Sequence, residues 1–145
     1  MKVTKAKPIR VLVADDFKLL RDVIRLYLER AADVDIVDEA PDLKDALERT
    51  REAQPDVIIM NDYLPPTDSA HASARFRQLG YTAAILVISM HLEPGLIQRS
   101  FQSGANGFMH KDEIDDHLVD AVRRVYQGER YLSPKAGEAY SSPQG

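Results

Sequence analysis

The sequence contains no cysteine, and no glycine occurs before Gly80. Without cysteine, the chain can form neither a disulfide framework nor a thiolate metal site, which is compatible with a reducing cytoplasm. Without an early glycine, neither a P-loop nor a dinucleotide-binding G-x-G-x-x-G loop can follow the first strand-like segment. These two absences exclude the usual NTPases and nicotinamide enzymes.

A positive net charge and a long apolar run are also missing. The formal net charge is −4, whereas a chain that binds nucleic acid by itself usually presents a basic face. No segment has the length and apolar character of a membrane span. The basic start, MKVTKAKPIR, runs directly into a strand-like stretch without the apolar region of a signal peptide. We therefore expect a cytoplasmic chain that binds neither nucleic acid nor a membrane on its own.

The pattern along the chain predicts one α/β domain, for which 145 residues with 44% hydrophobic content are sufficient. Strand-like runs cover residues 9–15, 34–40, 56–61, 83–89 and 106–110. Helical periodicity covers residues 17–32, 42–53, 69–79, 93–103 and 113–127, with Gly80, Gly104 and Gly128 after the last three. Five consecutive βα units predict a parallel sheet with right-handed crossovers and helices on both faces.

The apolar positions of the helical segments define the predicted core. The first segment carries one stripe of apolar side chains, namely Phe17, Leu20, Ile24, Tyr27, Leu28 and Ala31. The third segment contributes Phe76 and Leu79, and the last contributes Ile114, Leu118, Val122 and Val125. We expect these faces to pack against the sheet.

Polar side chains follow the predicted strands where each strand ends. They are Asp15 and Asp16 after the first strand, Asn61 and Asp62 after the third, Ser89 after the fourth and Lys111 after the fifth. In open parallel sheets, ligands bind outside the carboxyl ends of the strands. The sequence therefore places two acids, an amide, a hydroxyl and an ammonium group at one rim.

Each of these residues has an ordinary role when it is taken alone. Asp16 could cap the following helix, and Asn61 could be a turn residue before a proline-containing loop. Ser89 is a common residue at a strand end, Lys111 a typical surface lysine, and Phe108 a typical core residue. Only their joint order indicates a site. The four histidines, His71, His91, His110 and His117, have no metal-ligand spacing and are expected to be structural or exposed to solvent.

Four segments in this order resemble the receiver domain of two-component response regulators, in the NarL/FixJ (LuxR-type) branch. They are VADD (13–16), PDVIIMN (55–61), VISMH (87–91) and GANGFMHKDE (104–113). The resemblance implies a flavodoxin-like (CheY-like) doubly wound sheet of five parallel strands in the order 2-1-3-4-5, with five helices. It also implies a flexible basic N-terminus at 1–7, a receiver domain at 8–133, and a C-terminal tail at 134–145 without an output domain.

The resemblance further implies a role for each residue at the rim. In this family, a carboxylate at the end of the third strand accepts a phosphoryl group from a histidine kinase. By position, Asp15 and Asp16 correspond to the Mg²⁺ ligands, together with residue 61 and the backbone carbonyl of Tyr63. Ser89 and Lys111 correspond to the residues that contact the phosphoryl oxygens, and Phe108 corresponds to the switch aromatic. The phosphoacceptor position is occupied by Asn61.

The assignment of position 61 depends on the register of the third strand. Residue 61 lies six positions after Pro55 and four before Pro65, as the family pattern requires, whereas residue 62 would match only through Pro66. Successive side chains on a strand point to opposite faces. If Asn61 faces the acid pair, we therefore expect Asp62 to point away from it.

The amide at position 61 changes the predicted function. It lacks the charge that makes a carboxylate a nucleophile, and the loss of one clustered negative charge predicts weak Mg²⁺ binding. The resemblance thus implies a non-phosphorylatable receiver, natural or engineered, with no catalytic residue. Such a receiver would act through protein contacts or control a DNA-binding output domain outside this chain.

Partners and an alternative function follow from the same segments. The resemblance implies a histidine kinase or another signalling protein as the partner, and a weak homodimer through the last helix, where Val125, Tyr126 and Tyr131 are apolar or aromatic. A Mg²⁺-dependent phosphotransfer or phosphatase enzyme on a similar α/β fold is the alternative. The absent nucleophile and the lack of a D-x-D arrangement after the first strand disfavour it.

Overall fold

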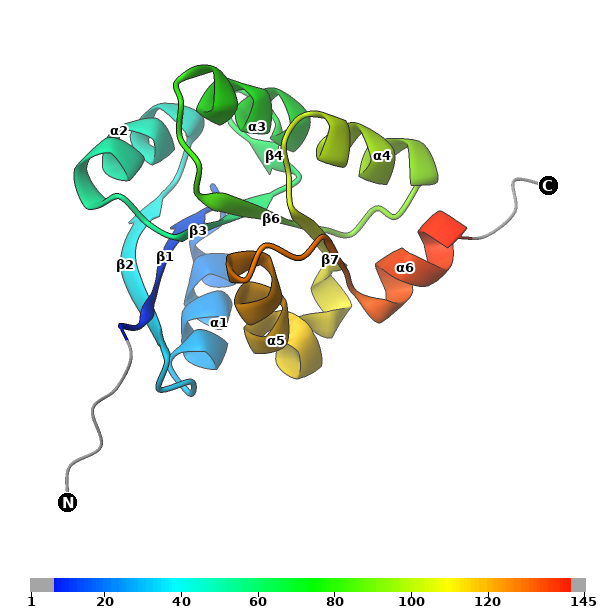
Figure 1. The fold of residues 1–145 in the computed structure, drawn as a ribbon, viewed down its shortest axis with the longest axis horizontal. Coiled ribbons are helices and arrows are strands. Elements are labelled where there is room, and N and C mark those ends of the chain that lie inside the picture. The colour runs from blue at the N-terminus through cyan, green and yellow to red at the C-terminus, as the bar shows by residue number, and fades with distance from the viewer. Residues whose placement is uncertain (1–6, 142–145) are drawn as a thin grey trace.

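The computed structural model describes residues 7–141 and contains one parallel sheet with helices on both faces (Figure 1). The six strands of this sheet lie in the order β2-β1-β3-β6-β7-β8. Their bounds are β1 (Ile9–Ala14), β2 (Val34–Ala40), β3 (Val57–Asn61), β6 (Ala84–Ser89), β7 (Gly107–His110) and β8 (Tyr131–Leu132). The first five strands have the predicted doubly wound order, and β8 adds a short parallel strand beyond β7.

Two layers of helices cover the sheet. Their bounds are α1 (Lys18–Leu28), α2 (Leu43–Ala53), α3 (Ser69–Gln78), α4 (Pro94–Gln102), α5 (Ile114–Tyr126) and α6 (Pro134–Ser141). Figure 1 shows α1 and α5 together on one face, and α2, α3 and α4 on the other. A 3₁₀ turn, η1 (Lys111–Glu113), joins β7 to α5, and an antiparallel pair, β4 (Tyr63–Leu64) and β5 (Thr67–Asp68), follows β3. No helix of the described part is both long and apolar enough to cross a membrane.

The alternation of side chains along the central strands builds two cores. In β1, Val11 and Val13 belong to the core under α1 and α5, whereas Leu12 and Ala14 belong to the core under α2, α3 and α4. All four side chains are almost completely buried. Because both faces of the central strands are covered, these strands are continuous apolar runs, as the sequence pattern indicated.

The helix ends agree with the local sequence signals. The side chains of Asp42 and Asp68 accept hydrogen bonds from the backbone N–H groups of Asp45 and His71, at the starts of α2 and α3. After α4 the chain turns at Gly104, where φ is +111°. A Cβ atom there would lie 2.7 Å from Cγ of Arg77, so only glycine fits this turn.

Three predictions about the elements were wrong. Helix α1 begins at Lys18, so Phe17 precedes the helix in extended conformation and is 61% exposed instead of joining the core. Leu79 follows α3 as its C-cap and is 46% exposed. Six helices and six parallel strands replace the expected five of each, because residues 131–141 form β8 and α6.

The C-terminal segment differs most from its prediction. Residues 134–141 form α6, which packs against α4, β7 and β8. Val125 and Tyr131, which had suggested a dimer surface, are 2% and 6% exposed, and only Tyr126 of that group is exposed. The predicted flexible residues 1–6 and the final residues 142–145 lie outside the described part of the chain.

Candidate functional site

The predicted site residues meet at the carboxyl ends of β1, β3, β6 and β7. Strand β1 lies between β2 and β3, so the chain winds in opposite directions on the two sides of β1. A crevice at such a reversal is the usual ligand site of an open α/β sheet. The site residues of the sequence analysis are the last residues of these strands or follow them directly, except for Phe108, which lies within β7.

Asp15 is a buried carboxyl group at the end of β1. It is 2% exposed, and its Oδ1 accepts a hydrogen bond of 2.8 Å from the backbone N–H of Phe17. The pKa of Asp15 is raised to about 6, mainly because of burial and also because of the negative charge of Asp16, while the N–H of Phe17 and the charge of Lys111 act in the opposite direction. The structure therefore places Asp15, Asp16 and Lys111 within electrostatic reach of one another.

Asp16 is exposed and does not cap the first helix. The N-cap residue of α1 is Phe17, and no side chain caps that end. The ordinary role considered for Asp16 is thus not the one observed. Its carboxylate is left at the rim beside Asp15.

Asn61 ends β3 and is half-buried. Its Nδ2 donates a hydrogen bond of 3.0 Å to the backbone carbonyl of Tyr63. Its Oδ1 is buried and has no hydrogen-bond partner among the described residues. A buried acceptor without a partner is costly, so this oxygen is suited to receive a cation or a donor from outside the chain.

The oxygen atoms at this rim are of the type that binds a hard cation. Asp15, Asp16 and Oδ1 of Asn61 are the oxygen ligands that Mg²⁺ prefers. No group of three or more histidine, cysteine or acidic residues that could hold a metal ion occurs in residues 7–141. The site thus offers two carboxylates and one amide oxygen, and the amide nitrogen of Asn61 engages the Tyr63 carbonyl.

Asp62 contacts Ser89, so it takes part in the rim, which the alternation of side chains along β3 did not predict. The hydroxyl of Ser89 donates a hydrogen bond of 2.6 Å to Oδ2 of Asp62. The regular strand ends at Asn61, so the alternation rule no longer sets the direction of the next side chain. The backbone N–H of Asp62 donates to the carbonyl of Ile88, which holds residue 62 against the end of β6.

Lys111 and Phe108 come from the last long strand of the sheet. Lys111 is half-buried at the start of η1. Phe108 lies in β7, is completely buried, and belongs to the same core cluster as Ile97 of α4 and Ala136 of α6. Phe108 therefore faces inward, beneath the C-terminal helix.

The family model for the response regulator receiver domain matches residues 11–123, which include every residue of this rim. The chain belongs to the response regulator receiver domain family. This receiver is 31% identical over 127 residues to the oxygen regulatory protein NreC of Staphylococcus carnosus, covering 87% of the present chain and 58% of that protein. It is 32% identical over 134 residues to the probable transcriptional regulatory protein NarL of Mycobacterium tuberculosis, covering 92% and 62%.

Solved structures agree with this membership. A LuxR-family two-component response regulator from an Aurantimonas species superposes with a TM-score of 0.88 at 29% identity, covering 93% of this receiver and 96% of that chain. The signal receiver domain of M. tuberculosis NarL gives a TM-score of 0.74 at 33% identity, covering 81% and 98%. The chain is a receiver domain of a two-component response regulator with NarL-type relatives. It spans about 60% of the length of the curated relatives named above.

Three large apolar or aromatic side chains that follow site residues in the sequence are exposed. Phe17, Tyr63 and Met90 are 61%, 48% and 53% exposed, and each lies one or two positions after a site residue. The sequence analysis placed Phe17 in the core and assigned only the backbone carbonyl of Tyr63 to the site. The signal that could have identified them is their position directly after the strand ends.

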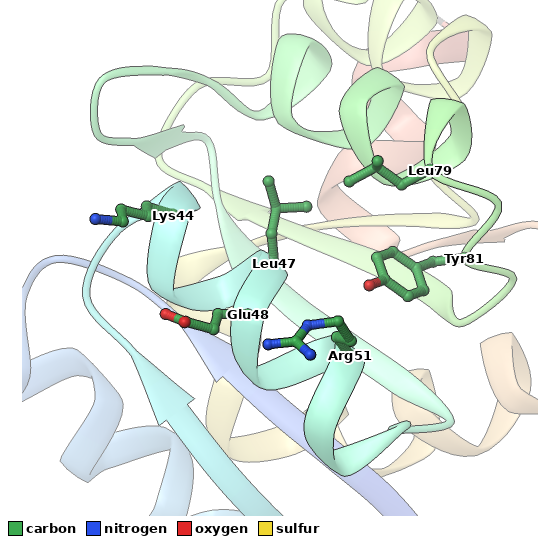
Figure 2. Close-up of a pocket in the computed structure, with 6 residues that line it drawn as sticks. All are labelled: Lys44, Leu47, Glu48, Arg51, Leu79 and Tyr81. Atoms are coloured by element: carbon green, nitrogen blue, oxygen red, sulfur yellow. The ribbon is translucent and has the colours of Figure 1, made fainter.

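An open groove lies elsewhere on the molecule, between α2 and the C-terminal end of α3. It is lined by Lys44, Leu47, Glu48, Arg51, Leu79 and Tyr81 (Figure 2). The residues of the rim do not line it. The candidate site is therefore the polar rim itself and not this groove.

Proposed function

We propose that this receiver works without forming an aspartyl phosphate at its acceptor position. The observation that carries the proposal is the amide of Asn61 at the end of β3, on the rim that holds Asp15, Asp16 and Lys111. A carboxylate attacks phosphorus through a charged oxygen, whereas an amide oxygen carries no full charge and is a poor nucleophile. The rest of the constellation supports a role in phosphoryl recognition inherited from the family.

The side chains have distinct roles in this proposal. Asp15, Asp16, Oδ1 of Asn61 and the backbone carbonyl of Tyr63 would hold Mg²⁺, which would supply positive charge against phosphoryl oxygens. Lys111 and Ser89 would contact those oxygens. Because Asn61 is neutral and its Nδ2 donates a hydrogen bond to the Tyr63 carbonyl, we expect weaker Mg²⁺ binding than in an Asn61→Asp variant.

The test compares the chain with its Asn61→Asp variant. Both are incubated with Mg²⁺ and a small acyl phosphate, and intact mass is measured for one added phosphoryl group. We expect the variant to gain this mass and the unmodified chain to stay unchanged. Calorimetric titration with Mg²⁺ on the same pair measures the difference in affinity.

The matched control for the same assay is Asp62→Ala. Modification of the unmodified chain that disappears in Asp62→Ala would identify Asp62 as the acceptor and refute the proposal. If Asn61→Asp gains no mass, the remaining residues do not support phosphoryl transfer. The receiver would then be a binding module that retains only the fold.

The partners of the whole protein belong to the same proposal. The chain covers less than two-thirds of relatives named as regulatory proteins, which supports control of a DNA-binding output region by this domain. We propose signalling contacts with a histidine kinase or a related protein, no enzymatic turnover, and location in the cytoplasm. A weak homodimer is part of the proposal, and sedimentation at increasing protein concentration tests it.

A further inference from the structure

The Ser89 hydroxyl is a buried group whose single proton is already used in a hydrogen bond. Ser89 is 0% exposed. Its Oγ donates to Oδ2 of Asp62 at 2.6 Å and accepts from the backbone N–H of His91 at 2.8 Å. A hydroxyl has one proton to donate. The proton of Ser89 is therefore committed to Asp62 and unavailable to another acceptor.

Two hydrogen bonds of the Asp62 backbone fix the position of this residue. The N–H of Asp62 donates to the carbonyl of Ile88 at 3.1 Å, and its carbonyl accepts from the N–H of Ser69 at 2.8 Å. These bonds attach residue 62 to β6 on one side and to the start of α3 on the other. A hydroxyl donating to a carboxylate forms one of the stronger hydrogen bonds in proteins, and this one is short.

The bonds join three segments that are separate in the sequence. Asp62 follows β3, Ser89 ends β6, and His91 lies in the loop that leads from β6 to α4. The hydrogen bond from His91 to Ser89 continues into the hydrogen bond from Ser89 to Asp62. The carboxylate at the end of this series belongs to the protein itself. The start of the loop before α4 is therefore fixed without an external anion.

We infer that Asp62 is an internal anionic partner of Ser89 and positions the loop between β6 and α4 in the absence of any phosphoryl group. The inference deepens the proposed function, because it assigns a control element to the same rim. An external anion that needs the Ser89 proton must first displace Asp62. In this inference, Asp62 is a positioning residue for the loop before α4.

The experiment measures the loop directly by NMR. Hydrogen exchange of the His91 amide and ¹H–¹⁵N shifts of residues 90–93 are compared in the unmodified chain and in Asp62→Leu, Asp62→Asn and Ser89→Ala. We expect His91 exchange to accelerate at least tenfold in Asp62→Leu and in Ser89→Ala. Asp62→Asn keeps an acceptor oxygen, so it should give a smaller effect. The double variant Asp62→Leu/Ser89→Ala should exchange no faster than either single variant.

Two further readouts separate a specific bond from a general structural effect. The ¹³Cγ resonance of Asp62 should move in Ser89→Ala and stay unchanged in the control Asp22→Asn, which alters an exposed pair with Lys18. If Asp62→Leu does not fold, Asp62→Asn and the ¹³Cγ shift still decide the question. His91 exchange that is unchanged in both Asp62 variants but fast in Ser89→Ala would overturn the inference.

These measurements use no phosphoryl donor, so they are independent of the mass assay. Phosphoryl transfer to the unmodified chain would refute the proposed function and leave the Asp62–Ser89 result intact. An unchanged loop in the Asp62 variants would refute the inference and leave the role of Asn61 intact.

Discussion

Asp15 is a site residue whose ionisation is altered by the fold. Its pKa is raised to about 6, first because burial disfavours its charge. A raised carboxyl pKa means that the folded state binds the proton more tightly than the unfolded state, so the contribution of Asp15 to stability is greatest below about pH 4 and is lost as the pH rises from about 4 to about 6. In metal-free buffer at pH 8, we expect Asp15→Asn to increase the free energy of unfolding by about 1–3 kcal/mol.

Urea unfolding at a series of pH values, in the presence of a chelator, checks this prediction. Asp15→Asn and the unmodified chain should have nearly equal stability at pH 4 and diverge toward pH 7. Asp22→Asn, an exposed change on α1, should follow the unmodified chain within about 0.5 kcal/mol throughout. Parallel curves for Asp15→Asn and the unmodified chain would show that burial does not raise this pKa.

The positions of the site residues could be predicted from the sequence because they follow regular strands. Asp15, Ser89 and Lys111 each lie at the end of a buried run that is visible in the pattern. The contact of Asp62 could not be predicted, since the strand ends one residue earlier and no periodicity describes the residues beyond that end. Phe17 was misplaced for a similar reason, because helical spacing continues across a residue that lies before the helix.

Elements that pack as amphipathic units were also predictable, and α6 was not. The five longer strands and the first five helices carry a period of two or 3.6 residues, or a continuous apolar run. Helix α6 has only eight residues, about two helical turns, and includes Gly137, so its sequence gives only a short pattern. Its position depends on tertiary contacts with α4, β7 and β8, and on the hydrogen bond from the Lys135 N–H to the buried carboxylate of Glu113 in η1.

The start of α6 is held by Glu113, which gives a prediction at the scale of the element. Oε1 of Glu113 accepts a hydrogen bond of 2.8 Å from the backbone N–H of Lys135, and Glu113 is only 6% exposed. Glu113→Ala removes this acceptor, so we expect a stability loss of about 1–2 kcal/mol and faster hydrogen exchange in residues 135–141. Hydrogen exchange followed by mass spectrometry measures the effect by segment.

A neighbouring residue is the matched control for this helix. Asp112 also contacts Lys135, through an exposed ion pair of 3.3 Å with Nζ. Exposed pairs contribute little, so Asp112→Ala should change stability by less than about 1 kcal/mol and leave exchange of the α6 amides nearly unchanged. Equal effects of the two substitutions would mean that charge near α6, and not the buried acceptor, holds the helix.

The two ends of the sheet differ in role: the rim at the carboxyl ends of the strands carries the candidate site, and the opposite rim contributes to stability. At the carboxyl ends of the strands, acids are clustered and Oδ1 of Asn61 has no partner in the described chain. At the opposite ends of β6 and β7, the guanidinium of Arg77 donates to backbone carbonyls and a side-chain amide. Its acceptors are the carbonyls of Tyr81, Ala83 and Gly104, and Oδ1 of Asn106. One side chain, Arg77, therefore satisfies four acceptors at the second rim, whereas Oδ1 of Asn61 at the first rim has no partner among the described residues.

Arg77 thus connects α3 with the loops that enter two neighbouring strands, and burial lowers its pKa. Arg77→Met keeps the apolar stem and leaves several acceptors without their donor, so we expect the free energy of unfolding to fall by about 2–4 kcal/mol. The half-exposed pair between Arg123 and Asp33 supplies the control, since Arg123→Met should cost less than about 1 kcal/mol. Urea unfolding measures both.

Under conditions where Arg77→Met is still folded, the amide shifts of residues 89–93 should match those of the unmodified chain, because the second rim supports the sheet without contacting the site. Equal losses from the two arginine substitutions, or a disturbed loop before α4, would contradict this division of the molecule.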